Sequence, residues 1–241
     1  MVALAVRLSL VIPAYNEEIR IAMTLDRVGK YLSRQGYDFE IIVVDDGSLD
    51  TTAELVRALY PNVRVIEYKP NRGKGQAVKT GMLAAEGEYR VFYDADGSTP
   101  IEELDAMWKC FDSGADIVIG SRSLPDSDVQ VRQHPVRESM GRTFNLFVKM
   151  LLGLPFIDTQ CGFKGFTARA AQIVFPLQQR NRFSFDAELL YIALKHRLRI
   201  DETPVCWINS PHSRVKIIRD SLDMLRGIIR IRLNDLARKY E

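Results

Sequence analysis

Two apolar runs in the first hundred residues end in carboxylates, and this placement could support chemistry. Asp94-Ala95-Asp96 follows the run Val91 to Tyr93, and Asp45-Asp46 follows the run Glu40 to Val44. A strand that ends in such residues presents acidic oxygens at the carboxyl edge of a sheet, where open α/β folds bind ligands and hard divalent cations find oxygen ligands. One such pair arises by chance in surface loops, but two in succession predict a metal and diphosphate site.

The segments that would position these carboxylates alternate between strand and helix patterns. Apolar runs at residues 8–12, 40–44, 63–68, 91–94 and 117–119 predict strands, and apolar residues at helical spacing lie between them. This alternation predicts an α/β fold with a mostly parallel central sheet that is flanked by helices on both faces.

The chain changes character after Arg122. Residues 123–133 are polar and lack periodicity, which predicts a long loop beside the ligand edge. A helix with an apolar stripe, a loop with a short strand, a second helix and a last strand are then expected at residues 140–152, 158–167, 186–195 and 200–208. Because no linker separates the halves, we expect one domain over residues 1–213, divided into 1–122 and 123–213, and a C-terminal helix over residues 214–241.

The composition excludes several classes of protein. A chain of 241 residues with 46% hydrophobic content can bury a full core, and a formal charge of +2 does not indicate nucleic-acid binding. Cys110, Cys161 and Cys206 are odd in number and widely spaced, so we expect no disulfide framework, no zinc site and a reducing, intracellular setting. No run approaches the ~20 apolar residues of a spanning helix, so neither a transmembrane segment nor a secretion signal is expected.

The segment Asn71-Arg72-Gly73-Lys74-Gly75 is glycine-rich but is not a nucleoside-triphosphate loop. It lacks the Gly-x-x-x-x-Gly-Lys-Ser/Thr spacing. A dinucleotide cofactor is also disfavoured, because no Gly-x-Gly-x-x-Gly follows the first strand. The glycines still allow amides at a helix N-terminus to approach an anion, with Lys74 adding charge. The alternative is a tight turn with a solvated lysine.

Seven segments, in this order and spacing, resemble the family 2 glycosyltransferases of the GT-A fold. They are Val11 to Glu18, Val43 to Ser48, Asn71 to Gly75, Asp94 to Gly97, Gly120 to Arg122, Asp158 to Lys164 and Phe185 to Leu190. The last two are similar to the dolichyl-phosphate glucosyltransferase branch, near the dolichyl-phosphate mannose synthases. The resemblance covers nearly the whole chain. It implies a single GT-A, Rossmann-like domain in which residues 1–122 bind a nucleotide sugar and residues 123–213 bind the acceptor.

The resemblance also implies which residues form the donor site. The nucleotide-sugar-binding set is Pro13, Tyr15, Glu17, Asp45, Asp46, Lys74, Asp94 and Ala95. Asp96 would be the main ligand of a divalent cation, Mg²⁺ or Mn²⁺, with support from Asp94. The mannose synthases have a glutamine where this chain has Ser98, and a neutral hydroxyl is a weaker ligand than an amide carbonyl. Arg214 lies where a basic residue closes on the donor diphosphate; the alternative is a charge at the start of a helix.

On the acceptor side, the resemblance places a phosphate against Arg122, Arg137 and Ser139. The alternative for Arg137 is a solvated loop charge. Asp94, Asp96, Arg122, Arg137 and Arg214 are therefore the residues that we expect to act in catalysis. A phosphate monoester is already anionic at neutral pH, so arginines that position it are sufficient and no general base is needed.

An acceptor with a sugar hydroxyl would instead require a carboxylate to remove its proton. Asp158, Asp186 and Glu188 are the candidates for that base. Each has a structural alternative, because Asp186, for example, could simply cap the helix that follows it.

The C-terminal segment predicts an amphipathic helix. Its apolar stripe consists of Ile218, Leu222, Leu225, Ile229, Leu233 and Leu236, widened by Ile217, Met224, Ile228 and Ile231. Residues 214–241 hold eight basic and four acidic side chains, an excess of +4 that favours an anionic membrane surface. The alternative is a helix packed on its own domain or on a second subunit of a homo-oligomer.

The hypothesis from the sequence is an inverting hexosyltransferase that moves glucose from UDP-glucose to a polyprenyl (dolichyl-type) phosphate, as a peripheral enzyme at the cytoplasmic face of the membrane. A GDP-mannose enzyme and a soluble glycosyltransferase with a hydroxyl acceptor are the alternatives within the class. A sugar-nucleotide-binding protein without catalysis is the alternative from another class. The intact carboxylate pairs together with Arg122 argue against a pure binder.

Overall fold

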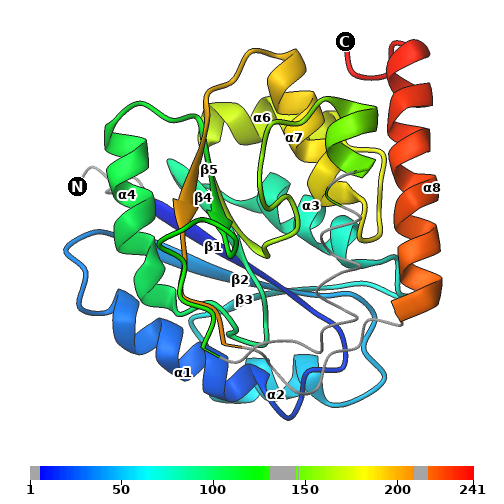
Figure 1. Cartoon of the computed structure of the whole chain (residues 1–241). Coiled ribbons are helices and arrows are strands. Elements are labelled where there is room, and N and C mark those ends of the chain that lie inside the picture. Colours follow the sequence, from blue (N-terminus) through cyan, green and yellow to red (C-terminus); the bar gives the residue numbers. More distant parts are fainter. Residues whose placement is uncertain (1–5, 131–144, 146, 209–216) are drawn as a thin grey trace.

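The computed structural model describes residues 6–130, 145, 147–208 and 217–241. A seven-stranded sheet forms its centre, in the order β3-β2-β1-β4-β6-β5-β7 (Figure 1). The strands are β1 (Leu8–Ala14), β2 (Phe39–Asp45), β3 (Arg64–Glu67), β4 (Tyr89–Tyr93), β5 (Ile117–Ser121), β6 (Phe163–Thr167) and β7 (Ile200–Pro204). The predicted α/β class and mostly parallel sheet are confirmed.

Helices cover both faces of the sheet. They are α1 (Ile21–Leu32), α2 (Thr52–Leu59), α3 (Lys74–Ala84), the 3₁₀ helix η1 (Ile101–Glu103), α4 (Leu104–Asp112), α6 (Ala168–Leu177), α7 (Phe185–Lys195) and α8 (Ile217–Leu236). Side chains of a strand alternate between the two faces. Val11 of β1 therefore joins the core under α3, α6 and α7, while Leu10 and Ile12 join the core under α1, α2 and α4.

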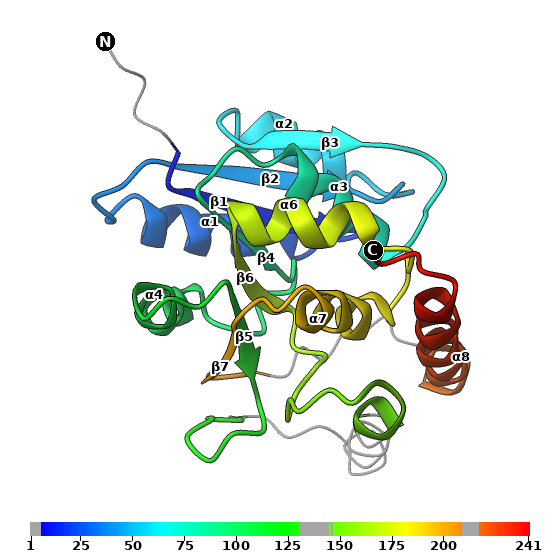
Figure 2. The same cartoon turned by 90° about the horizontal axis from the view of Figure 1, so that it is seen from above.

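One strand runs against the others. β6 pairs antiparallel with β4 on one side and with β5 on the other, whereas the remaining pairs are parallel. Residues from beyond Arg122 thus enter the centre of the sheet, and the two predicted halves of the domain share it. Because β6 is reversed, its first residues lie at the edge where the parallel strands end. Figure 2 shows β6 between β4 and β5.

The last predicted strand was too long. β7 ends at Pro204, because the chain then leaves the sheet edge: Val205 still donates its N–H to Ser121 O, but Ile208 donates to Ser98 O. Trp207 forms only an isolated bridge with Val129. This departure carries residues 205–208 across the edge that holds the Asp94-Ala95-Asp96 segment.

The C-terminal helix packs on the domain and also keeps an apolar surface. Ile228 and Ile231 are fully buried, and Gly227 lets α8 approach Ser184 at the start of α7 closely. Ile229 and Leu233, which the sequence assigned to the same stripe, are half exposed. The predicted single stripe is therefore divided between the core and the surface. None of the helices that the structure describes combines the length and apolarity needed to cross a membrane.

Candidate active site

Residues from five elements lie at the carboxyl edge of the parallel strands. Asp45 ends β2, Asp94 follows β4 and Arg122 follows β5, while Lys74 begins α3. Gly162 directly precedes β6, which starts at this edge because it is antiparallel. The fold therefore brings together residues that the sequence places far apart.

Lys74 forms an ion pair with Asp94, with Nζ 2.5 Å from Oδ1. Burial alone lowers the pKa of this lysine, but Asp94, Asp186 and Asp96 raise it more, so its pKa is raised overall. The ammonium stays charged at the ligand edge. The alternative of a solvated lysine is therefore wrong, and a cation stands where the sequence predicts a diphosphate.

The glycines before and within α3 serve chain packing. A Cβ on Gly73 would lie 2.5 Å from the carbonyl oxygen of Asn181, and one on Gly75 would lie 2.8 Å from that of Arg180. Gly73 also has a φ of 103°, which favours glycine. Because of these close contacts, the start of α3, which includes Lys74, packs against Arg180 and Asn181 in the segment before α7.

Asp45 and Asp46 have different surroundings. Asp46 accepts three hydrogen bonds of 2.8 Å, from the side chain of Asn71 and from the backbone N–H groups of Arg72 and Gly73. Asp45 accepts one from Ser48 N–H through Oδ1, and its buried Oδ2 has no hydrogen-bond partner among the described residues. Asp46 thus holds the loop before α3, while Asp45 retains an acceptor for a ligand.

The segment after β1 lies beside the loop after β2. Asn16, with a left-handed φ of 54°, donates its N–H to Ser48 Oγ at 2.8 Å, and its side chain accepts from Leu49 N–H at 2.7 Å. Pro13 is buried within β1, and Glu17 pairs with Arg20 at 2.6 Å. Pro13, Tyr15, Glu17 and Asp45 therefore share one end of the edge, which is what a common nucleoside site requires; their contacts with a nucleotide stay a prediction.

The segment around Asp96 offers hard oxygen ligands for a divalent cation. Ser98 donates its N–H to Asp96 Oδ1 at 3.0 Å, and the buried Ser98 Oγ has no hydrogen-bond partner in the part of the chain that the structure describes. Thr24 donates to the carbonyl of Ala95 at 2.7 Å and so fixes the residue between the two carboxylates. The described residues contain no group of three or more His, Cys, Asp and Glu side chains that could hold a metal by themselves. These ligands fit a cation that completes its shell with diphosphate oxygens.

Arg122 is held in a fixed orientation by Asp158. Its Nε and Nη2 donate to the two carboxylate oxygens at 2.7 and 2.9 Å, and its backbone N–H adds a third bond at 3.1 Å. Burial alone would raise the pKa of Asp158, but the charge and hydrogen bonds of Arg122 have the larger effect and lower this pKa to about 2. The guanidinium carbon also lies 5.6 Å from the centre of the Trp207 ring. Asp158 is therefore the ionised partner of Arg122 at neutral pH.

This ion pair predicts an acid-dependent stability. The folded-state pKa of Asp158 lies below its usual 3.8, so its contribution is present above about pH 4 and is lost as the pH falls toward 2. The full contribution is roughly 2 kcal/mol, about half of it lost by pH 3. Urea unfolding between pH 6 and pH 3 should show this loss in the wild type and a shallower pH dependence in Asp158→Asn. Equal pH dependence in both proteins would contradict the assignment.

The other two candidate bases, Asp186 and Glu188, also bind other groups of the protein. Lys164 Nζ lies 2.5 Å from Asp186 Oδ1, and both side chains are buried. Glu188 accepts from Gln179 N–H, Arg180 N–H and the hydroxyl of Tyr240. The helix-cap alternative for Asp186 is wrong, because Ser184 is the N-cap of α7 and Asp186 pairs with Lys164 instead.

Several expected residues lie outside the described part of the chain, namely Arg137, Ser139 and Arg214. Their roles stay predictions. Two residues of the site were not singled out from the sequence: Lys164, which stands inside a recognised segment, and Trp207. A charged residue within an apolar strand was the available signal for Lys164.

Comparisons with known proteins show the relatives of this chain. The family model Glycosyl transferase family 2 matches residues 9–171. A dolichyl-phosphate β-glucosyltransferase of Dictyostelium discoideum is 39% identical over 95% of this chain and 75% of that protein, and the enzyme of the same name from Homo sapiens is 33% identical over 96% and 76%.

Solved structures share the fold. Glucosyl-3-phosphoglycerate synthase of Mycobacterium tuberculosis, in complex with phosphoglyceric acid, has a TM-score of 0.70 at 22% identity, over 93% of this chain and 79% of that one. The same enzyme with Mn²⁺, UDP-glucose and phosphoglyceric acid has a TM-score of 0.69 at 21% identity, over the same shares. The fold is therefore that of the GT-A glycosyltransferases. With the family match and the curated relatives, it follows that the chain belongs to glycosyl transferase family 2.

Proposed function

We propose that this enzyme transfers glucose from UDP-glucose to a polyprenyl phosphate of the dolichyl type, with inversion at the anomeric carbon. The names of the relatives support the donor sugar and the acceptor class. The observation in the structure that carries the proposal is that Arg122 stands at the ligand edge, while Asp158, Asp186 and Glu188, the three carboxylates considered as a base, are each bound to other groups of the protein. That arrangement suits an acceptor that is already an anion.

The geometry around Arg122 supports a phosphate as the acceptor. Asp158 occupies Nε and Nη2 of Arg122, and among the described residues Nη1 makes no hydrogen bond. A guanidinium oriented in this way can bind phosphate oxygens with little loss of side-chain freedom. The attacking oxygen of a phosphate monoester needs no base, because it carries no proton that must be removed at neutral pH.

The candidate bases are poorly suited to a hydroxyl acceptor. Asp158 has a pKa of about 2, far below the range of an effective general base at neutral pH. Asp186 is 3% exposed and paired with Lys164, and Glu188 is fully buried under Tyr240. Burial does raise the pKa of Asp186 and Glu188, but neither carboxylate is open to an incoming substrate.

The donor side would hold the diphosphate between carboxylates and cations. Asp96 and Asp94 would bind Mg²⁺ or Mn²⁺, which when bound neutralises the charge that develops on the departing diphosphate. Lys74 adds a protein cation at the same place, and Asp45 offers its second oxygen to the nucleoside. The acceptor phosphate, oriented by Arg122, then attacks the anomeric carbon in line with the leaving diphosphate, so an α-linked donor gives a β-linked product.

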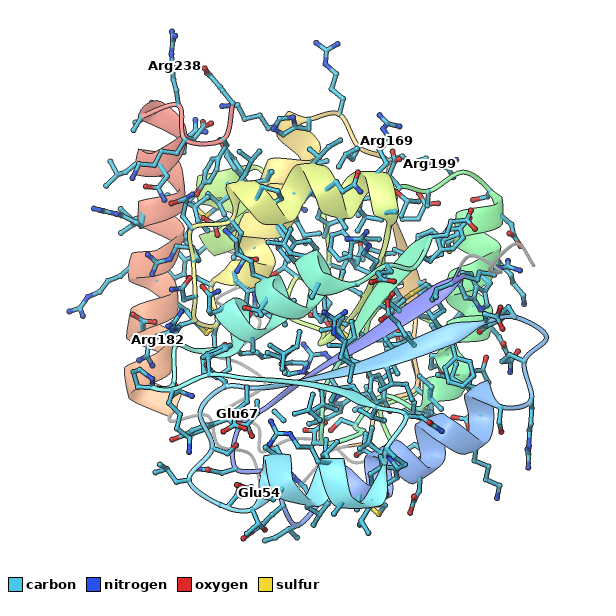
Figure 3. All side chains as sticks on the ribbon, turned by 180° about the vertical axis from the view of Figure 1, so that it is seen from behind. Glu54, Glu67, Arg169, Arg182, Arg199 and Arg238 are labelled. Carbon is cyan, nitrogen blue, oxygen red and sulfur yellow. The ribbon has the colours of Figure 1, made fainter. Side chains whose placement is uncertain are left out.

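A lipid acceptor fits the surface around α8. Ile229 and Leu233 are half exposed, and Leu236 is 73% exposed. Residues 147–152 form a neighbouring helical segment whose Met150 is 71% exposed, and a groove of about 340 Å³ lies between this segment, α7 and α8. Arg238 points away from the domain at the end of α8 (Figure 3). Apolar side chains next to exposed arginines are typical of helices that lie on anionic membranes.

Binding to anionic vesicles tests this surface. We expect the double variant Leu233→Glu/Leu236→Glu to sediment with such vesicles at least about tenfold more weakly than the wild type. The variant loses the free energy that the wild type gains when two leucine side chains move from water into the membrane. Leu59→Glu is the matched control, since Leu59 on α2 is 60% exposed on another part of the surface. Equal binding by the wild type and the α8 variant would exclude this part of α8 from the membrane contact.

The choice of nucleotide tests the donor. Calorimetry in the presence of Mg²⁺ or Mn²⁺ should show UDP binding at least about tenfold more tightly than GDP, a difference of ~1.4 kcal/mol. Turnover should require UDP-glucose together with a polyprenyl phosphate. If GDP binds tenfold more tightly than UDP, a mannosyltransferase replaces the proposal.

A further inference from the structure

Lys164 is a fully buried lysine that has no part in the chemistry proposed above. It lies in β6, its side chain is 0% exposed, and its Nζ is 2.5 Å from both Asp186 Oδ1 and the carbonyl oxygen of Cys161. The ammonium also lies 5.4 Å from the centre of the Phe92 ring. Buried ion pairs contribute little to stability compared with apolar side chains of similar volume. A role in stability alone is therefore a weak explanation for the pair.

The contact with Cys161 leads directly to the donor site. The carbonyl that Lys164 holds belongs to the peptide unit between Cys161 and Gly162. Gly162 lies against Asp94 so closely that a Cβ on it would be 1.9 Å from Asp94 Oδ2 and 2.6 Å from Oδ1. The Gly162 backbone, which follows the carbonyl bound by Lys164, therefore packs directly against the Asp94 carboxylate.

Lys74 lies on another side of the same carboxylate. Its Nζ contacts Asp94 Oδ1 at 2.5 Å, and both lysines act on Asp186, whose charge also acts on Lys74. Asp94 is therefore held between the Gly162 backbone and Lys74. Positions of ligand-binding groups that are fixed in this way before the substrate arrives need no rearrangement in the transition state.

We propose that Lys164 and Asp186 are positioning residues of the donor site: the pair holds the Cys161 carbonyl, and thereby keeps the Gly162 backbone against Asp94 and that carboxylate directed at Lys74 and the donor. The importance of Asp94 for the donor rests on the proposed function, whereas the hold on Gly162 rests on the contacts alone. In this assignment Asp186 is the counter-ion of Lys164 and takes no proton from the acceptor.

Three variants and one control separate positioning from stability. Lys164→Met removes the donor to Cys161 but leaves the buried Asp186 carboxylate unpaired. Lys164→Met/Asp186→Leu removes both charges, a change that is often neutral for stability. Gly162→Ala keeps the ion pair and displaces Asp94 directly. Arg90→Met is the matched control, because Arg90 is also a buried cation that donates to backbone carbonyls, those of Met82 and Gly87, at the opposite end of β4.

Thermal unfolding and steady-state kinetics give the first two readouts. We expect the double variant to unfold near the wild-type temperature and still to have a kcat at least tenfold lower. Gly162→Ala should show the same loss of kcat. Arg90→Met should unfold at a lower temperature but keep its kcat within twofold. If the double variant recovers wild-type kcat together with stability, or if Gly162→Ala keeps wild-type kcat, the pair is only structural and the proposal is overturned.

Crystal structures of the same proteins give a readout that does not depend on activity. In the double variant and in Gly162→Ala, the Asp94 carboxylate should move out of hydrogen-bond distance of Lys74 Nζ. An unchanged Asp94 in both structures would overturn the proposal. If the wild type does not turn over UDP-glucose, the proposed function fails, but these structures still decide whether Lys164 and Asp186 position Asp94.

Discussion

Replacing Asp96 with alanine is expected to lower turnover of UDP-glucose at least about 100-fold, which corresponds to ~3 kcal/mol of transition-state stabilisation. The expectation follows from the shortage of hard ligands at this edge: the described residues offer no cluster of three acidic or metal-binding side chains that could replace it. Turnover should be measured at saturating Mg²⁺ or Mn²⁺, with circular dichroism to show that the variant is folded.

The matched control for this variant is Asp112→Ala. Asp112 ends α4, is exposed, and lies away from the carboxyl edge of the sheet, so its removal should leave turnover within about twofold. Near-normal turnover by a folded Asp96→Ala protein would refute the assignment of the metal to this segment. It would also remove the reason for placing the donor diphosphate beside Lys74.

The second large effect concerns Arg122. Arg122→Ala should lower kcat/KM for the phosphate acceptor about 100-fold, because it removes the proposed ion pair between the guanidinium and the acceptor phosphate. Truncating one partner of such a desolvated, hydrogen-bonded charge pair typically costs ~2–5 kcal/mol. UDP affinity should stay unchanged, since the proposed diphosphate site consists of Asp96, Asp94 and Lys74. Kinetics with varied acceptor and calorimetry with UDP measure the two effects separately.

Removing Arg122 alone also leaves the buried Asp158 without its cation, so a second variant is needed. Arg122→Ala/Asp158→Asn removes both charges of the pair and keeps a side-chain acceptor for one of the two backbone N–H groups, those of residues 122 and 160, that donate to Asp158 in the wild type. It should be more stable than the single variant and equally poor with the acceptor. Glu188→Gln should keep most of its activity. Normal acceptor kinetics in both arginine variants, with Glu188→Gln inactive but folded, would instead indicate a hydroxyl acceptor and a carboxylate base.

The sequence by itself determined the fold class and the donor motif. Strand and helix periodicity is a local property, and the sheet it predicted is present. Asp94 and Asp96 are two residues apart, so wherever β4 ends they lie at the same edge. Asp45 follows the same logic at the end of β2. The resemblance to family 2 glycosyltransferases also rests on short segments, which is why it could be recognised before any contact was known.

Only the tertiary structure decided which partners the charged residues beyond Arg122 have. Arg122 and Asp158 are 36 residues apart, and Lys164 and Asp186 are 22 apart, so no local pattern pairs them. Their roles depend on β6 entering the sheet antiparallel, which puts Gly162 beside Asp94. The same holds for α8, where packing divides one apolar stripe into buried Ile228 and exposed Leu233. Periodicity shows which side chains share a face of a helix, but the partner that covers the face, and the charge that compensates a buried ion, come from segments that are distant in sequence.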